Sequence, residues 1–149
     1  MKETVDPQEF LKRLKEMFRI SRIYYPGAGF PRDQFLEGPF KLEEIVYLEK
    51  KKDIPVHFRD KGYYVIGDFG KLPFRDGSFD ALYYHDNHAK LPETDDMIKI
   101  VRLGGIIIHS NDCDENMDIT KFEKIPGMKK LDLPFTNQYY TVFQRVQPF

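Results

Sequence analysis

The chain has 149 residues, of which 41% are hydrophobic and 32% are charged, with 23 basic and 24 acidic side chains and a formal net charge of −1. This content is too apolar for a disordered tail, and the even charge balance gives no general attraction to nucleic acid, which we do not expect as a partner. The single cysteine, Cys113, excludes an internal disulfide and a zinc site built on several thiolates, so no metal site is expected.

The N-terminal segment predicts an amphipathic helix from Pro7 to Ile20. Asp6 suits the capping position, Pro7 the first helical position, and Glu9 completes a capping-box pattern. Apolar residues then recur at helical spacing at Phe10, Leu11, Leu14, Met17 and Phe18. We expect one domain over residues 1–149, with this helix in 1–21 and the core in 22–146.

Beyond this helix the chain alternates short apolar runs with turns and weaker helical patterns. The expected strands are Arg22–Tyr25, Ile45–Glu49, Tyr63–Ile66, Phe79–Tyr84, Gly105–His109, Lys129–Leu133 and Tyr139–Val146. The expected helices are Asp33–Leu36, parts of Leu42–Glu44 and Val56–Lys61, and Thr94–Leu103, the last ended by Gly104-Gly105. This alternation favours an α/β sheet with right-handed crossovers, whereas the short 134–138 link makes the last two strands an antiparallel hairpin.

Residues suited to ligand binding follow the first three expected strands. Gly27 and Gly29 come after the first strand, Glu49 ends the second, and Asp68 follows the third. Glycines at a strand end let a ligand approach the backbone, and an acid at the next strand end can accept from both ribose hydroxyls. Asp68 can accept from an adenine amine, with Phe69 or Leu72 against the ring. Taken singly, the glycines can equally be turn residues and Glu49 a solvated acid.

The order and spacing of these segments resemble class I S-adenosylmethionine-dependent methyltransferases, and in particular small methyltransferase-type-11-like domains. The resemblance is carried by Gly27-Ala28-Gly29, Glu49, Asp68, Leu72-Pro73-Phe74, Gly77-Ser78-Phe79-Asp80 and Leu103-Gly104-Gly105-Ile106. It implies a three-layer α/β sandwich around a Rossmann-like, mostly parallel seven-stranded sheet of order 3-2-1-4-5-7-6, with an antiparallel C-terminal hairpin. It also implies S-adenosylmethionine as cofactor, with the glycines beneath its methionine end, Glu49 on the ribose and Asp68 on the adenine.

Two positions depart from the family pattern, and one segment offers candidate catalytic groups. Tyr25 stands where the family often has an acid for the cofactor ammonium, and Pro31 replaces the third glycine. After the fourth strand, Tyr84 can pack on the methionine chain. His85, Asp86 and His88 follow it as candidate bases, because a base helps when the methyl acceptor must lose a proton. Residues 109–112, which include His109, follow the fifth strand at the same edge. They are slightly weaker candidates for the same catalytic role.

The leading hypothesis is therefore a methyltransferase acting on a small-molecule acceptor or on an exposed group of a partner, with the small molecule favoured. The alternative is a non-catalytic methyltransferase-like binding module with weakened or lost cofactor affinity. A nicotinamide-dependent oxidoreductase fits less well, because Arg32 stands where a glycine is needed for close helix–strand packing. The chain has no segment large enough for a substrate domain, so the N-terminal helix or the second subunit of a homodimer would have to cover the cleft. With no secretory signal and no apolar run of ~20 residues, we expect a cytoplasmic protein without membrane contact.

Overall fold

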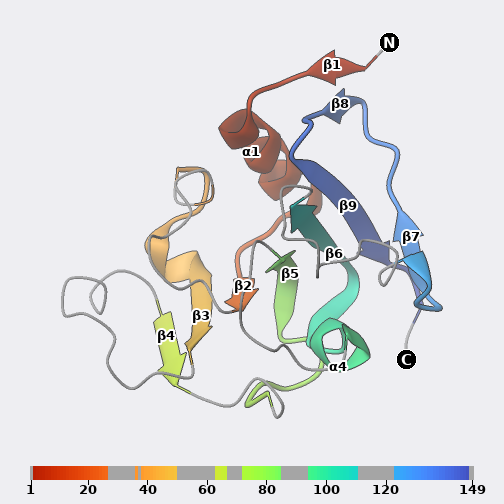
Figure 1. Ribbon diagram of the computed structural model, residues 1–149. Coiled ribbons are helices and arrows are strands. Elements are labelled where there is room, and N and C mark those ends of the chain that lie inside the picture. Colours follow the sequence, from red (N-terminus) through yellow and green to blue (C-terminus); the bar gives the residue numbers. More distant parts are fainter. Residues whose placement is uncertain are drawn as a thin grey trace.

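The computed structural model describes residues 2–26, 36, 38–49, 63–66, 72–84, 94–110 and 123–147 (Figure 1). Its elements are β1 (Glu3–Thr4), α1 (Pro7–Phe18), β2 (Ile23–Pro26), the 3-10 turn η1 (Leu42–Glu44), β3 (Ile45–Glu49), β4 (Tyr63–Ile66), β5 (Phe79–Tyr84), α4 (Thr94–Ile98), β6 (Val101–Ser110), β7 (Met128–Lys130), β8 (Phe135–Thr136) and β9 (Tyr140–Arg145). The helix expected over Val56–Lys61 lies outside the described residues, as does that over Asp33–Leu36 except for the buried Leu36.

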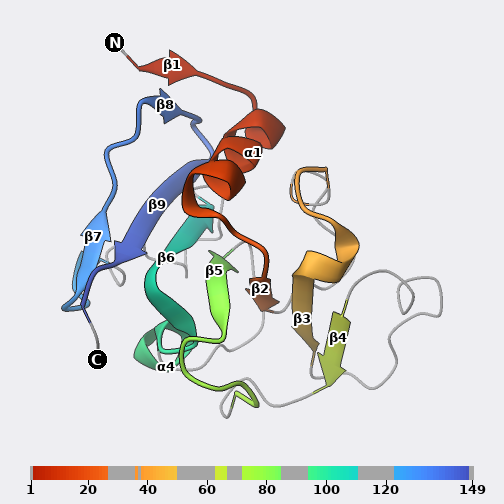
Figure 2. The same ribbon diagram turned by 180° about the vertical axis from the view of Figure 1, so that it is seen from behind.

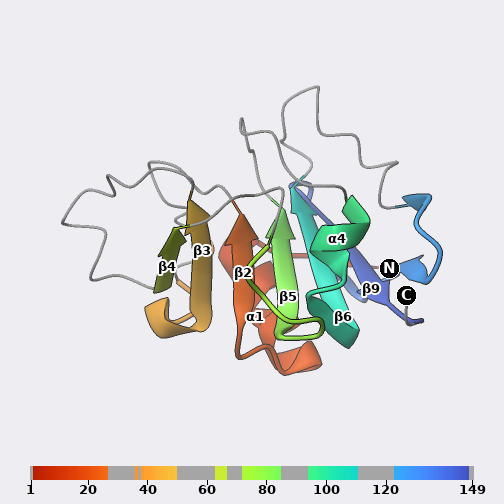
Figure 3. The same ribbon diagram turned by 90° about the horizontal axis from the view of Figure 1, so that it is seen from below.

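Seven strands form one sheet in the order β4-β3-β2-β5-β6-β9-β7. Neighbouring strands from β4 to β6 pair in parallel, and β9 runs antiparallel to both β6 and β7 (Figure 3). Counted from β2, this is the order 3-2-1-4-5-7-6, so the expected topology and the C-terminal hairpin are both confirmed. The sheet order reverses between β2 and β5.

The two faces of the sheet are covered by different helices, α1 on one side and α4 on the other (Figures 1 and 2). Successive side chains of a strand point to opposite faces of the sheet. Tyr25 therefore belongs to the apolar cluster beneath α1, whereas its neighbour Tyr24 belongs to the cluster beneath α4. Leu11 and Leu14 of α1 complete the first cluster, and Met97 of α4 contributes to the second. The three-layer α/β architecture expected from the sequence is thus present.

Helix α1 begins and ends close to its predicted limits. Asp6 caps it, with its carboxylate accepting from the backbone N–H of Glu9 at 2.8 Å. The Glu9 carboxylate accepts from Arg13 one turn later, so the return bond of a capping box is replaced by an ion pair. The helix ends at Phe18 because Arg19 adopts a left-handed conformation (φ 52°). Within the described residues, no helix has the length and apolar character needed to cross a membrane.

The helix expected over Thr94–Leu103 is wrong in its second half. The helix stops at Ile98, and strand β6 already begins at Val101. Tertiary hydrogen bonds cause the change: the carbonyl oxygen of Lys99 accepts from Gly77 N–H, and that of Ile100 accepts from Phe79 N–H, both at 2.9 Å. The backbone therefore leaves the helix to pair with the beginning of β5.

Gly104 and Gly105 were expected to end a helix, but they lie within a bulge of strand β6. Phe79 pairs with Val101 and Ala81 pairs with Ile106, so β6 carries three more residues than β5 over the same interval. Gly104 has φ +83°, and a Cβ on Gly105 would lie 2.6 Å from the carbonyl oxygen of Asp80. The bulge needs glycine at both positions because one is left-handed and the other touches backbone.

A second, two-stranded sheet joins the N-terminal residues to the link of the C-terminal hairpin, and the sequence did not reveal it. Strand β1 pairs in parallel with β8, which lies within the 134–138 link of the C-terminal hairpin. Asn137 fastens this pair: its amide donates to the carbonyl oxygen of Val5 at 2.8 Å, and its side-chain oxygen accepts from Tyr139 N–H at 2.9 Å. The N-terminal residues are thereby held against the hairpin.

Candidate functional site

The carboxyl ends of β4, β3, β2 and β5 lie next to one another at a single edge of the sheet. Pro26 of β2 pairs with Leu48 of β3, and Glu49 of β3 pairs with Ile66 of β4. In open α/β sheets ligands bind at this edge, in the crevice where the strand order reverses. The segments that follow β2, β3 and β4 therefore start from adjacent points, which is the arrangement a single ligand needs to reach all three.

Most of the residues predicted to form the site lie outside the described part of the chain. These residues are Gly27, Gly29, Asp68, Phe69, His85, Asp86 and His88. Each follows directly from a described strand end: β2 for the glycines, β4 for Asp68 and Phe69, and β5 for the two histidines and Asp86. Glu49 is the last residue of β3, and its backbone pairs with β4. The roles given to these residues stay predictions.

Tyr25 is a core residue at the end of β2. Its side chain is only 2% exposed, and its ring contacts those of Tyr47 on β3 and Tyr83 on β5, with centroids 5.6 and 5.1 Å away. The three rings occupy neighbouring strands on the face beneath α1. A tyrosine thus fills, with apolar packing, the position at which the resembling family often has a carboxylate.

Consecutive tyrosines at the end of β5 face opposite sides of the sheet. Tyr83 is fully buried, and its hydroxyl shares a 3.0 Å hydrogen bond with the hydroxyl of Tyr140 on β9. Tyr84 is half-buried on the other face, where it packs against the apolar cluster beneath α4. Of these two rings, therefore, only that of Tyr84 is partly exposed at the candidate site.

His109 stacks on Tyr84 at the same edge. The two residues are paired across β5 and β6, and their rings lie 5.7 Å apart at an interplanar angle of 18°. His109 is 2% exposed and Ser110, the next residue, is 1% exposed. The sequence indicated His109 by its position after the fifth strand, but the stack depends on strand register, which the sequence does not display.

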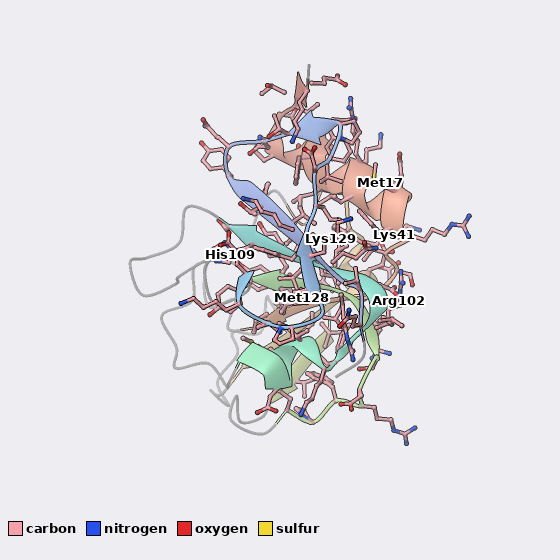
Figure 4. The ribbon with its side chains drawn as sticks, turned by 90° about the vertical axis from the view of Figure 1, so that its right-hand side faces the viewer. Met17, Lys41, Arg102, His109, Met128 and Lys129 are labelled. Carbon is pink, nitrogen blue, oxygen red and sulfur yellow. The ribbon has the colours of Figure 1, made fainter. Side chains whose placement is uncertain are left out.

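Asp80, which ends the segment Gly77-Ser78-Phe79-Asp80 of the family resemblance, lies at the beginning of β5, away from the candidate site. It has a structural role. One of its oxygens accepts from Ser21 N–H, Ser21 Oγ and Arg22 N–H, at 2.8, 3.0 and 3.1 Å, and the other accepts from Arg102 Nε at 2.8 Å. Burial raises the pKa of Asp80, but the hydrogen bonds from Ser21 and Arg102 outweigh it and hold the pKa below its ordinary value. Figure 4 shows Arg102 and His109 apart from one another, near the two ends of strand β6.

A groove of about 940 Å³, many of whose lining residues are charged, runs along α1 and is distinct from the candidate site. Its described lining residues include Glu9, Lys12 and Glu16 of α1 and Glu44 of η1, and none is a predicted site residue. The ion pair between Lys15 and Glu44, at 2.5 Å, joins its two sides. In the described part of the chain, no three His, Cys, Asp or Glu side chains gather as a metal site would require.

Comparison with known proteins identifies the fold. No protein-family model matches the chain, and no curated protein sequence matches it. Among solved structures, a methyltransferase from Geobacter sulfurreducens is similar over 94% of this chain and 78% of its own, with 13% identity and a TM-score of 0.61. The 1,6-didemethyltoxoflavin-N1-methyltransferase of Burkholderia thailandensis, with bound 1,6-didemethyltoxoflavin and S-adenosylhomocysteine, is similar over 95% of this chain and 79% of its own, with 11% identity and a TM-score of 0.57.

The same fold also occurs in a protein named for a different reaction. The 4+2 cyclase SpnF is similar over 84% of this chain at 14% identity, with a TM-score of 0.53, and the match spans only 58% of the cyclase. These likenesses establish the fold of the class I S-adenosylmethionine-dependent methyltransferases for this chain. Activity has to be argued from the site itself.

Proposed function

We propose that this chain, with the fold of the S-adenosylmethionine-dependent methyltransferases, binds S-adenosylmethionine and transfers its methyl group to a small-molecule acceptor. The observation that carries the proposal is the adjacency of the strand ends. Because β2, β3 and β4 end side by side in parallel register, the glycine segment, Glu49 and Asp68 all start from one edge.

The chemistry of these positions suits the methyl donor. Glu49 offers a carboxylate for a pair of ribose hydroxyls, and Asp68 offers an acceptor for the adenine amine. Gly27 and Gly29 leave room for the amino-acid end to approach the backbone. Half-buried Tyr84 supplies aromatic surface at the end of β5, the strand that neighbours β2.

When bound, S-adenosylmethionine supplies a methyl group that is already electrophilic. The chain's own residues then have two tasks, to align an acceptor and to receive its proton. We assign proton acceptance to the segment after β5, where His85, Asp86 and His88 follow within four residues of Tyr84. An imidazole titrates near neutral pH, as such a base should.

One observation favours the alternative, a binding module with weakened cofactor affinity. The Tyr25 ring is buried among Tyr47 and Tyr83, so this position offers no charged partner for the cofactor ammonium. The loss of one charge-assisted hydrogen bond costs about 1.5–3 kcal/mol of binding, roughly ten- to a hundredfold. Weakened binding would still be measurable by calorimetry.

The deciding experiment is isothermal titration calorimetry of the chain with S-adenosylmethionine and with S-adenosylhomocysteine. We expect both to bind, and we expect Glu49→Ala to weaken both by roughly ten- to a hundredfold, since two hydroxyls lose their acceptor. The matched control is Glu43→Ala, which removes an exposed acid of the adjacent turn η1 and should leave both affinities unchanged.

Two results would contradict the proposal in different ways. If neither compound binds the wild-type chain, the methyltransferase assignment is wrong and the binding-module alternative takes its place. If both bind and Glu49→Ala binds them as tightly as wild type, the ribose role of Glu49 is wrong and the donor must be held differently.

A further inference from the structure

An aromatic and an imidazole ring form a stacked pair at the edge where the strand order reverses. Tyr84 and His109 are the register partners at the ends of β5 and β6, with ring centroids 5.7 Å apart and an interplanar angle of 18°. Near-parallel rings at this separation hold one another in a fixed orientation. His109 is 2% exposed, whereas Tyr84 is half-buried, so it is Tyr84 that presents surface to a ligand.

The pair lies beside the end of β2, the strand that precedes Gly27 in the sequence. Tyr24 of β2 pairs with Leu82 of β5, and continuing this parallel register places Tyr84 level with Pro26, the residue before Gly27. The apolar clusters on the two faces of the sheet hold the end of β5 in its orientation. Tyr83 is held on the α1 side by Tyr140, which leaves the Tyr84 side chain on the α4 side. A ligand in the crevice between β2 and β5 would therefore meet the Tyr84 ring.

The donor and the product of a methyl transfer differ in charge at one atom. S-adenosylmethionine carries a positively charged sulfonium, and S-adenosylhomocysteine carries a neutral thioether. Among the described residues at the ends of β2, β5 and β6 there is no acid, and the side chains there include Tyr25, Tyr84 and His109. An aromatic face makes a favourable contact with a neutral thioether, but it adds an electrostatic attraction for a cation that the thioether lacks.

We propose that the Tyr84 ring, held in place by His109, contacts the donor's sulfonium and makes the site prefer S-adenosylmethionine to S-adenosylhomocysteine. The inference rests on the proposed function. His109 is a positioning residue, because both of its ring nitrogens are buried and it acts through the orientation of Tyr84. The preference eases exchange of the neutral product for a new donor molecule.

The test compares two dissociation constants in each of several variants, and it needs no knowledge of the acceptor. Calorimetry gives the ratio of the constant for S-adenosylhomocysteine to that for S-adenosylmethionine. We expect Tyr84→Leu to lower this ratio by roughly two- to thirtyfold relative to wild type, chiefly by weakening donor binding. Tyr84→Phe keeps the ring face and should keep the ratio.

Two variants of His109 separate positioning from simple support of the fold. His109→Phe retains a flat ring beneath Tyr84 and should retain the ratio, whereas His109→Leu removes the stack and should lower the ratio in the same direction as Tyr84→Leu. The control is Phe74→Leu, which truncates another half-buried aromatic of the same cluster and should leave the ratio unchanged. Circular dichroism of each variant establishes that it is folded.

The outcomes distinguish this inference from the function on which it rests. If the wild-type chain binds neither compound, the proposed function is wrong and the inference falls with it. If both bind and the ratio for folded Tyr84→Leu stays within about 1.5-fold of wild type, below the smallest expected cation–ring effect, only the inference is overturned. A ratio lowered equally by Tyr84→Phe and Tyr84→Leu would also overturn it, because the hydroxyl and not the ring face would then be responsible.

Discussion

Asp80 ties the beginning of β2 to the bulge of β6, and its removal should destabilise the fold without altering the candidate site. In Asp80→Ala, the backbone N–H groups of Ser21 and Arg22 and the guanidinium of Arg102 all lose an acceptor. Hydrogen bonds to a charged group are each worth roughly 1.5–3 kcal/mol when buried. The Asp80 side chain is 20% exposed, so water can replace part of this contribution.

We therefore expect Asp80→Ala to lower the free energy of unfolding by about 2–4 kcal/mol, a large part of the 5–15 kcal/mol typical of a domain. Urea unfolding followed by circular dichroism measures this loss. The control is Asp76→Ala, which removes an exposed acid from the preceding turn. If the two variants unfold within about 0.5 kcal/mol of each other, the proposed role of Asp80 is refuted.

The same residue predicts a pH dependence with a definite sign. The native pKa of Asp80 lies below the ordinary value of roughly 3.9, because the bonds from Ser21 and Arg102 outweigh the effect of burial. The carboxylate's contribution is therefore complete above the ordinary value and is lost as the pH falls through the native pKa. The stability difference between wild type and Asp80→Ala should be constant from pH 7 to about 5 and should shrink below about pH 4. A difference that grows on acidification would contradict the assignment.

Two further substitutions test the packing around the sheet. Gly105→Ala would put a Cβ 2.6 Å from the Asp80 carbonyl oxygen and 2.9 Å from that of Arg102, and we expect urea unfolding to show a loss of about 1–3 kcal/mol or more. Gly38→Ala, whose Cβ would meet only the flexible Gln8 side chain, is the control, and equal losses would contradict the reasoning. Asn137→Ala leaves Val5 C=O and Tyr139 N–H without their partner and should cost about 1–2 kcal/mol. In that variant, hydrogen exchange at Val5 N–H should accelerate while exchange in β6 does not, and unchanged exchange at Val5 would show that Asn137 does not hold β1 in place.

The sequence alone determined those features that depend on local pattern and on order along the chain. Strands β3, β4 and β5 have the predicted limits, because each is a short run of apolar and aromatic residues suited to a strand. The start of α1 could be predicted because the capping side chain of Asp6 accepts a hydrogen bond from Glu9 N–H, only three residues further along the chain. The C-terminal hairpin followed from the shortness of the 134–138 link. The strand order followed from the family resemblance, since periodicity does not say which strands are neighbours.

Tertiary structure alone decided those features in which a residue meets a partner far along the chain. Residues 99–103 read as helix locally, but Gly77 and Phe79 offer backbone donors to Lys99 and Ile100 and draw that segment into a strand. Strand β1 exists only because β8, more than a hundred residues later, supplies its hydrogen bonds. The features of the candidate site also fall into those predicted from the sequence and those known only from the structure. The sequence placed Glu49 and Tyr84 at strand ends, but the burial of Tyr25 and the stacking of His109 on Tyr84 depend on register between strands. The hydrophobic pattern of a strand restricts which of its side chains face the core, but the partner of each residue on a strand distant in the sequence is decided only when the sheet packs.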